Sequence, residues 1–270
     1  GDHNVFVGHY TGYNNTSGAR NTSLGSNTLV ANTTADNNTA IGYAAMIANT
    51  TGTGNVAVGA YCLDANTTGG DNCAFGVNAA TDITTGNTNT CVGHTAGANI
   101  SQGNNNLLLG HDAGTSSSPS GGIVNGSNAV CLGDNNISDL FCADTSISSS
   151  DSRDKTDVTS FNIGLAWIEA LRPVTYRWDR RTWYGTDEEP FGTPDGSKKR
   201  TKLHIGFLAQ EALEIEKANG YGSSNDDSLV VNLTEDGNSY GMKYERLVPI
   251  LVNAIKELSA KVEELESKLN

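Results

Sequence analysis

The sequence predicts a mainly β protein, in which a repetitive β-helical shaft is followed by an α+β domain that ends in a coiled-coil helix. Three observations lead to this fold class. The composition changes abruptly near residue 149, glycines recur every 17 residues before that point, and heptad-spaced Leu, Ile and Val close the chain. We therefore expect two domains, at residues 1–149 and 150–270, with the coiled coil at about residues 247–270.

The change in composition separates two kinds of chain. Residues 1–149 contain one basic residue, Arg20, and nine acidic residues, all of them Asp. Residues 150–270 contain 16 basic residues, 21 acidic residues and all three Trp. The first part consists mainly of Asn, Thr, Gly, Ser and Ala, a composition that suits either a disordered segment or a regular repeat.

Properties of the whole chain exclude several functions. The net charge of −13 argues against a nucleic-acid surface, because phosphate binding needs clustered Lys and Arg. No apolar run approaches the ~20 residues of a membrane span, so we expect no membrane insertion. The five Cys are odd in number and irregular in spacing, which predicts free thiols rather than a disulfide framework. They also lack metal-ligand spacing, and we expect neither a metal nor a cofactor.

A strict repeat organises the first part. Each of the first seven units has a Gly, an Asn four residues before it, and three small or apolar residues between them. A strand of three residues is too short to be stable alone, so we expect stacking in register, with ladders of Asn side chains. The glycines that set the phase are Gly8, Gly25, Gly42, Gly59, Gly76, Gly93 and Gly110, and an eighth unit ends at Gly133 after an insertion of six residues.

Two other architectures compete with an intertwined shaft. A disordered linker has a similar composition, but a linker has no reason to keep a 17-residue phase over seven units. A single-chain β-solenoid has the same repeat. Because three strand residues per unit enclose little core, we expect instead that three chains wind together and share one core. The predicted assembly is a homotrimer.

The second part alternates helical and strand patterns. An apolar face from Ile163 to Leu171 indicates a helix that Pro173 ends. Strands are expected at residues 174–178, 203–207, 229–233 and 239–243, and further helices at residues 209–217 and from about Tyr244 onward.

The last helix has a coiled-coil pattern. Its a positions are Ile255, Val262 and Leu269, and its d positions are Leu251, Leu258 and Leu265. β-branched residues at a with Leu at d permit dimers as well as trimers. An amphipathic helix that packs on its own domain is the alternative, since the pattern spans fewer than three full heptads.

Four motifs follow one another in this part: Ser150-Asp151-x-Arg153-x-Lys155; Leu171-Arg172-Pro173-Val174-Thr175-Tyr176-Arg177-Trp178; Gly206-Phe207-Leu208-Ala209-Gln210-Glu211; and Tyr244-x-x-Leu247-Val248-Pro249-Ile250-Leu251 continuing to Leu258. Together they resemble the S74 peptidase family, the intramolecular chaperone domain at the C-terminus of phage tail spikes, tail fibres and neck appendages. The resemblance covers residues 150–270. A related domain occurs in a membrane-tethered animal transcription factor, but the upstream repeat favours the viral proteins.

This resemblance implies a single-turnover serine autoprotease with a Ser–Lys dyad that acts in cis. Ser150 would attack the carbonyl of Ser149, and Lys155, in its neutral form, would accept the serine proton. Asp151 and Arg153 would fix the turn or a trimer contact. Taken without the downstream motifs, the same residues indicate a solvated Ser/Asp linker with incidental charges.

The resemblance also implies a biological setting. The chain would be the distal part of a viral or phage tail fibre or spike, folded in the host cytoplasm and then part of the virion. Its C-terminal domain would align three chains and then remove itself between Ser149 and Ser150. A host surface receptor or glycan bound by the shaft would be a further partner. The alternative is a structural adhesin with an uncut, permanent trimer cap, and a protease acting in trans ranks third.

Four histidines suggest no catalytic role. His204 lies in a strand pattern and is expected to pack in the core rather than act as a base. His9, His94 and His111 directly follow repeat glycines, which predicts surface side chains. Histidines stacked along a fibre could instead bind a metal on a threefold axis.

Overall fold

The computed structural model describes residues 1–137, 140, 150–186, 189–234 and 237–269. They form two compact units. Unit 1 comprises Gly1–Ser138, Asp179–Lys198 and Thr234–Ser239, and unit 2 comprises Asp139–Trp178, Lys199–Leu233 and Tyr240–Asn270. The predicted boundary between residues 149 and 150 borders a segment that lies outside the described residues.

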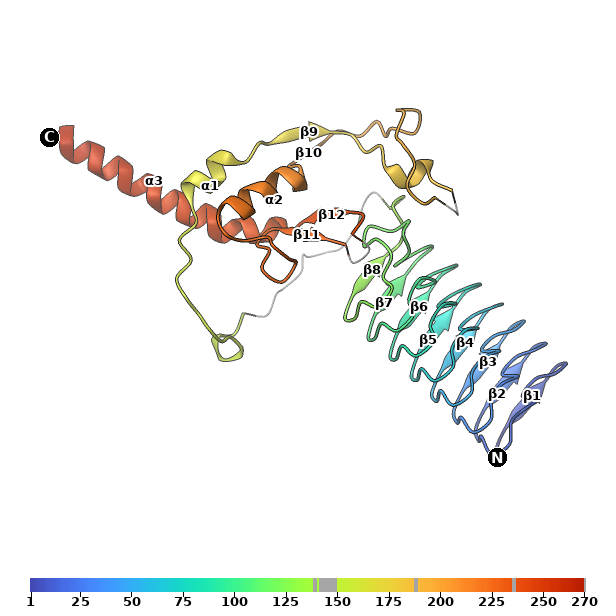
Figure 1. Ribbon diagram of the computed structural model, residues 1–270. Helices are drawn as coiled ribbons and strands as arrows, with labels where there is room; N and C mark the ends of the chain where they lie inside the picture. The colour runs from blue at the N-terminus through green and yellow to red at the C-terminus, as the bar shows by residue number, and fades with distance from the viewer. Residues whose placement is uncertain (138–139, 141–149, 187–188, 235–236, 270) are drawn as a thin grey trace. The chain divides into compact units, whose positions relative to one another are not determined.

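Unit 1 is built on a parallel β-solenoid with one short strand per turn (Figure 1). From β1 to β7, each strand residue pairs with the residue 17 positions later. Between β7 and β8 the step is 23 residues, so the six-residue insertion lengthens one turn without breaking the stack. The strands are β1 Val5–Val7, β2 Thr22–Leu24, β3 Thr39–Ile41, β4 Val56–Val58, β5 Cys73–Phe75, β6 Thr90–Val92, β7 Leu107–Leu109 and β8 Val130–Leu132.

The solenoid fills its own interior. The central residues of β2 to β8 are buried, and Ala40 and Ala57 have no exposed surface. A second buried row comes from the turns, where Leu29, Met46 and Leu63 are also fully buried. A single chain therefore closes the core, and the expectation of three intertwined chains is corrected. That expectation counted only strand residues and missed the apolar residues of the turns.

Buried asparagines hold the stack in register. The Nδ2 of Asn55 donates to the carbonyl of Gly69 at 2.8 Å, and its Oδ1 accepts from the N–H and the Nδ2 of Asn72 at 3.0 and 3.1 Å. Because each amide bonds the next turn, a one-residue slip breaks every such contact. The predicted ladder is confirmed in Asn21, Asn38, Asn55, Asn72, Asn89 and Asn106, each at most 2% exposed.

Glycine is required where each strand ends and the chain turns. Gly76 has a φ of 139°, and a Cβ added there would lie 2.3 Å from the carbonyl oxygen of Gly93 in the next turn. No other residue combines this φ with such close approach of two backbones. The 17-residue spacing of glycine is therefore a requirement of stacking.

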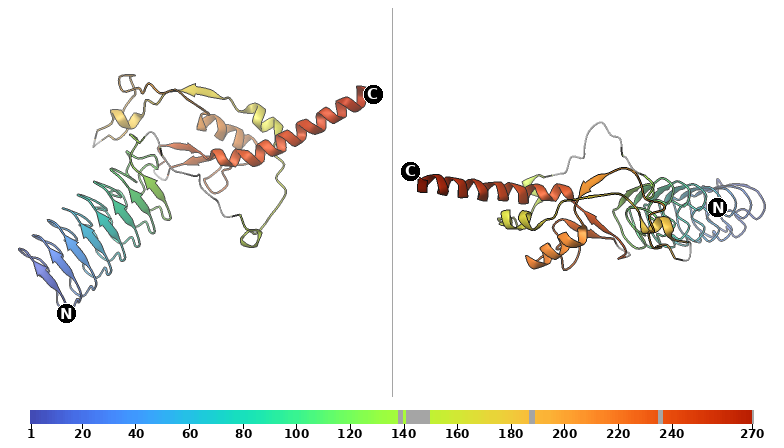
Figure 2. Two further views of the ribbon diagram at one scale, coloured as in Figure 1. Left: turned by 180° about the vertical axis from the view of Figure 1, so that it is seen from behind. Right: turned by 90° about the horizontal axis from the view of Figure 1, so that it is seen from above.

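Unit 2 combines helices with two small antiparallel sheets (Figures 1 and 2). Strand β9 pairs with β10, and β11 pairs with β12. Every helix and strand expected in this part is present, within a few residues of its expected ends. The elements are η1 Ser152–Asp154, α1 Leu165–Ala170, β9 Val174–Tyr176, β10 His204–Gly206, α2 Ala209–Ala218, β11 Val231–Leu233, β12 Tyr240–Met242, η3 Tyr244–Arg246 and α3 Leu247–Leu269.

The long helix α3 buries one face and exposes another. Leu247 and Ile250 are buried in the core of unit 2 together with Trp167. The heptad residues lie on a different face, and Ile255 and Leu258 are 65% and 52% exposed. The alternative in which the heptad face packs on its own domain is therefore wrong.

A segment from the second half of the chain belongs to unit 1. It contains η2 Arg181–Tyr184 and contacts the end of the solenoid. Arg180 Nη1 donates to Asn135 Oδ1 at 2.7 Å, and Asn135 Nδ2 donates to Thr182 Oγ1 at 3.2 Å. Since Asn135 follows β8, this segment lies beside the last turn, where a stack of strands would otherwise end in an open edge.

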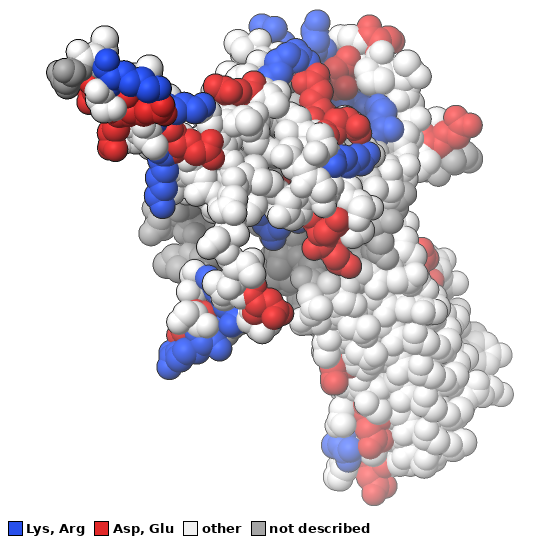
Figure 3. Space-filling view, turned by 60° about the vertical axis from the view of Figure 1, so that its left-hand side comes forward, with Lys and Arg blue, Asp and Glu red and all other residues white. Residues whose placement is uncertain are grey.

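Charge is unevenly distributed over the surface. On the face in Figure 3, the stacked turns of the solenoid carry few charged side chains, and most Lys, Arg, Asp and Glu lie on the rest of the chain. Among the described residues, no helix is both long and apolar enough to cross a membrane.

Candidate functional site

Two side chains of the first motif are in contact. The Nζ of Lys155 lies 2.7 Å from the Oγ of Ser150, and both residues are exposed. In an extended chain, five residues would separate the two positions by roughly 16 Å. The turn between them must therefore fold back on itself.

Asp151 and Arg153 build this turn. Asp151 is the N-cap of η1, and its Oδ1 accepts from the backbone N–H of Arg153 at 2.9 Å and from its Nε at 3.0 Å. The hydrogen bonds from Arg153 lower the pKa of the Asp151 carboxyl, which keeps the acceptor ionised. Lys155 is the C-cap of the same short helix, and its N–H donates to the carbonyl of Ser152. The turn thus directs Lys155 toward Ser150.

The pair has the chemistry of a nucleophile and its base. As an ammonium group, Lys155 donates to the serine oxygen, and as a neutral amine it can accept the serine proton. Ser149, which would supply the attacked carbonyl, lies outside the described residues. The geometry makes a Ser–Lys dyad feasible, and the catalytic roles of Ser150 and Lys155 stay predictions.

The other motifs contact one another within unit 2. Arg172 Nε donates to Glu211 Oε2 at 3.1 Å, and Arg172 Nη2 bonds the second oxygen. The N–H of Phe207 donates to the hydroxyl of Tyr244 at 3.2 Å. The second motif is therefore tied to the third, and the third to the fourth. Their side chains hold the fold together at positions far apart in the sequence.

Sequence reasoning did not single out Glu216, which is fully buried on α2. Its carboxylate accepts from Ser228 Oγ at 2.9 Å and from the backbone N–H groups of residues 229–231 at 2.6 to 3.2 Å. The carboxylate thereby fixes the chain that leads into β11. A signal was available, because Glu216 follows Ala209 and Ala212 at helical spacing on the buried face of α2.

Other residues were expected to have no role in the chemistry. His204 is half-buried rather than enclosed in the core, and its ring stacks on that of Tyr176 with centroids 5.4 Å apart. Among the described cysteines, Cys62, Cys91, Cys131 and the half-buried Cys73 are free thiols, as expected, whereas Cys142 lies outside the described residues. Burial raises the pKa of Cys62 and of Cys91 to about 12, so both thiols stay protonated.

Comparison with known protein families bears on the segment that begins with this dyad. The family model described as chaperone of endosialidase, Peptidase_S74, matches residues 150–221. The similarity to this family covers that segment alone, about a quarter of the chain. The matched segment begins at Ser150 and contains the first three motifs, whereas the motif from Tyr244 and the helix α3 lie beyond it. No curated protein and no solved structure matches the chain. The segment that is similar to Peptidase_S74 thus follows a β-solenoid in the same chain.

Proposed function

We propose that this chain is the distal part of a viral or phage tail fibre or spike, in which the Peptidase_S74 domain trimerises the chain and then removes itself. The observation that carries the proposal is the 2.7 Å contact between Lys155 Nζ and Ser150 Oγ. It lies at the first residue of the matched domain, where the domain follows the repetitive shaft. Cleavage between Ser149 and Ser150 would release residues 150–270.

The proposed reaction is an N-to-O acyl shift followed by hydrolysis. Ser150 Oγ attacks the carbonyl carbon of Ser149, and neutral Lys155 takes the hydroxyl proton. The C–N bond breaks, its nitrogen receives that proton, and Ser149 becomes an ester on Ser150. Water then hydrolyses the ester to the carboxylate of Ser149 and the free hydroxyl of Ser150. Because the nucleophile adjoins its own scissile bond, each chain reacts once.

Two exposed apolar surfaces support trimerisation. The heptad residues of α3 are exposed in the single chain, and burying them in a coiled coil removes that apolar area from water. The outer face of the solenoid sheet is also apolar, and extends about 35 Å at the usual strand spacing. The last residue of every strand is apolar: Val7, Leu24, Ile41, Val58, Phe75, Val92, Leu109 and Leu132. Three such faces could pack around one axis.

A repetitive shaft does not by itself fix the axial alignment of neighbouring chains in a trimer. Each solenoid sets its own strand pairing, but neighbouring solenoids present similar outer faces every 17 residues. They can therefore pack out of phase by whole units at little energetic cost. A C-terminal domain that holds three chain ends at one level removes those alternatives. Its later removal would leave the aligned shaft in the virion, available to a host receptor or glycan.

Denaturing gels and mass spectrometry of freshly purified protein test the cleavage. The wild type should yield a fragment of residues 150–270, whereas Ser150→Ala and Lys155→Ala should remain full length. Ser152→Ala is the matched control, because Ser152 is an exposed serine in the same turn, and it should be cut like the wild type. Cleavage of the Ser150 variant at the same bond would show that the dyad is assigned wrongly.

Light scattering of the uncut Ser150→Ala chain tests the trimer separately. Ile255→Lys places a charge in the heptad seam and should give monomers. Ala260→Lys places the same charge on the exposed f position of α3 and should leave trimers intact. A monomeric parent chain would contradict the trimer, irrespective of cleavage.

The alternative function is a structural adhesin with a permanent C-terminal cap. One observation favours it: both dyad side chains are exposed in the single chain, so nothing described there excludes water from the reacting atoms. A wild-type trimer that keeps its full-length mass would support this alternative.

A further inference from the structure

In the last three turns of the solenoid, the position that follows each strand-ending glycine is occupied by residues that can bind a metal ion. The residue after the strand-ending glycine is His94 in one turn, His111 in the next and Asp134 in the last. The imidazole rings of His94 and His111 are stacked, with centroids 5.4 Å apart and planes 6° from parallel. Stacking in register therefore brings together residues that are 17 and 23 positions apart in the sequence.

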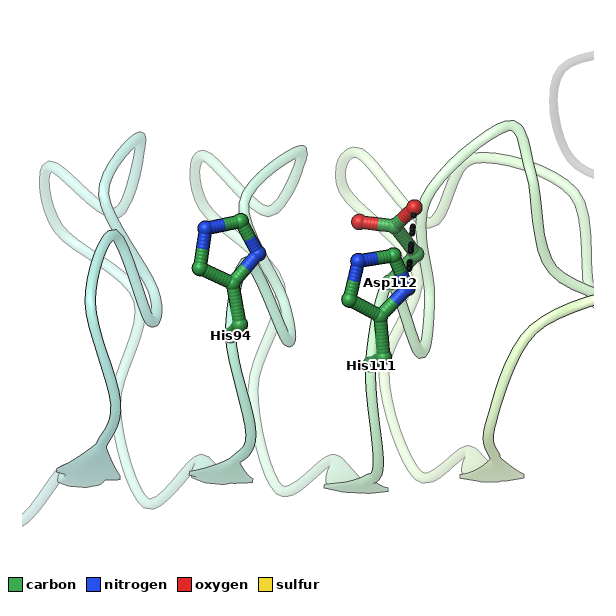
Figure 4. A group of neighbouring side chains, drawn as sticks. All are labelled: His94, His111 and Asp112. Carbon is green, nitrogen blue, oxygen red and sulfur yellow. Dashed lines mark ion pairs between the residues drawn. The ribbon is translucent and has the colours of Figure 1, made fainter.

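The carboxylate of Asp112 lies beside the ring of His111 (Figure 4). The Nδ1 of His111 lies 3.3 Å from an oxygen of Asp112 and 3.4 Å from an oxygen of Asp134. The Nδ1 of His94 lies 3.4 Å from the hydroxyl of Thr95, which donates to Asp112. One ligand atom from each of His94, His111 and Asp112 lies within 4.8 Å of the other two.

Hydrogen bonds from Asn136 fix the carboxylate of Asp134. Its Oδ1 accepts from the backbone N–H of Asn136 at 2.8 Å, and its Oδ2 accepts from the Nδ2 of Asn136 at 2.9 Å. The side chain of Asp134 is only 14% exposed, whereas that of His111 is 60% exposed. The carboxylate of Asp134 is thus held in place, while the exposed imidazole of His111 can rotate toward an ion.

We infer that His94, His111 and Asp112, with Asp134 as a fourth ligand or as the group that orients His111, bind a divalent transition-metal ion such as Zn²⁺. Two imidazoles with carboxylate oxygens suit Zn²⁺ and its neighbours and do not suit Mg²⁺ or Ca²⁺, which prefer oxygen alone. The inference concerns one chain and is independent of the dyad and of the trimer.

The site requires only local movement. Ligand atoms of a tetrahedral Zn²⁺ site lie about 3.4 Å apart, given bond lengths of about 2.1 Å. Parallel rings on successive turns cannot both aim a nitrogen lone pair at one ion, so at least one ring must rotate about its Cβ–Cγ bond. His94 and His111 are exposed, and rotation there displaces no core residue.

A bound ion would link β6, β7 and β8, the last three turns of the solenoid. The ligands are far apart in the unfolded chain and converge only when these turns stack. An ion that binds only the stacked form stabilises it. The lengthened turn between β7 and β8 lies within this linked region.

The chain contains its own control for the experiment. His9 occupies the same position after Gly8 in the first turn, but the next turn has Ser26 there instead of a second histidine. His9 contacts Tyr10, with ring centroids 4.1 Å apart. Removing His9 deletes an exposed imidazole without touching the proposed ligand set.

Calorimetric titration of tag-free, full-length Ser150→Ala chain with Zn²⁺ tests the inference. We expect one ion per chain, at least tenfold weaker binding in His94→Ala and in His111→Ala, unchanged binding in His9→Ala, and no binding of Mg²⁺. Co²⁺ bound to the parent chain should give the visible absorption spectrum of nitrogen and oxygen ligands, without the bands of thiolate ligands. This measurement does not depend on whether a variant folds. Zn²⁺ should also raise the thermal midpoint of the parent chain and not that of His111→Ala. Three results would each overturn the inference: no Zn²⁺ binding by the parent chain, binding by His94→Ala and His111→Ala as tight as that of the parent chain, or a loss of binding in His9→Ala as large as in those two variants.

Discussion

Replacing Asn55 by Ala removes one rung of the buried amide ladder. Its Nδ2 loses the bond to Gly69, and its Oδ1 no longer accepts from the N–H and the Nδ2 of Asn72. The carbonyl of Gly69 keeps a bond from Asn66 Nδ2 at 3.0 Å. The Nδ2 of Asn72 keeps its bond to Gly86 at 2.8 Å. The backbone N–H of Asn72 is the group that loses its bond to this ladder and stays buried.

The expected loss of stability follows from these contacts. A buried donor left without its acceptor costs about 1–3 kcal/mol, and each of the two other lost hydrogen bonds contributes about 1 kcal/mol. The free energy of unfolding should therefore fall by about 3–5 kcal/mol. With a urea dependence of about 2–3 kcal/mol per molar, the unfolding midpoint should drop by about 1–2 M.

Urea unfolding of the uncut chain, followed by circular dichroism, measures this change. Asn14→Ala is the matched control, because Asn14 is an exposed asparagine of the same solenoid, and its effect should stay within about 0.5 kcal/mol. If Asn55→Ala unfolded within about 0.3 M urea of the parent chain, the ladder would not be what stabilises the stack.

Three other experiments probe packing in both units. Glu216→Gln replaces a carboxylate oxygen by an amide NH₂ group that faces backbone N–H donors, and it should destabilise unit 2 by about 2–4 kcal/mol. The urea unfolding transition followed by Trp fluorescence measures this loss, and an unchanged transition would contradict the role of Glu216. Cys62 and Cys91 should resist a thiol reagent at pH 8 until the chain unfolds, and prompt labelling of either would contradict their burial. Burial raises the pKa of both thiols from 9.0 to about 12, so the unfolded chain loses these protons at a lower pH than the folded chain. The free energy of unfolding should therefore be unaffected by these thiols below pH 9 and should fall as the pH rises from 9 toward 12. Gly76→Ala should prevent regular stacking and lower the thermal midpoint by many degrees, whereas Gly241→Ala, whose new Cβ would have its nearest neighbour at 3.9 Å, should change it little.

The contact within the candidate dyad could be predicted from the local sequence. The spacing of the first motif selected Ser150 among the neighbouring serines, because it lies five residues before Lys155 and directly before Asp151. The contact between them depends on the cap that Asp151 provides to η1, which is a local interaction within six residues. Short-range hydrogen bonds of this kind can be predicted, because they need no partner from elsewhere in the chain.

Long-range packing could not be predicted in the same way. The buried role of Glu216 depends on N–H groups 13 to 15 residues further along the chain. His94 and His111 lie one 17-residue period apart, so the repeat places them on neighbouring turns, but the sequence favoured surface histidines over a metal site. The partners of Glu216, by contrast, are chosen by the fold and leave no local pattern.

By itself, the sequence determined the parts of this protein that repeat or alternate. A 17-residue period of Gly and Asn sets strand, turn and ladder, because each turn must present the same backbone and amide geometry to the next. Only the tertiary structure decided that one chain closes its own core. That outcome depends on Leu29, Met46 and Leu63, whose side chains lie in the turns and become interior only when the turn folds back over the strand. The 17-residue period shows which residues occupy equivalent positions in successive turns, and only the packing of the folded turns decides which of those residues meet in the core.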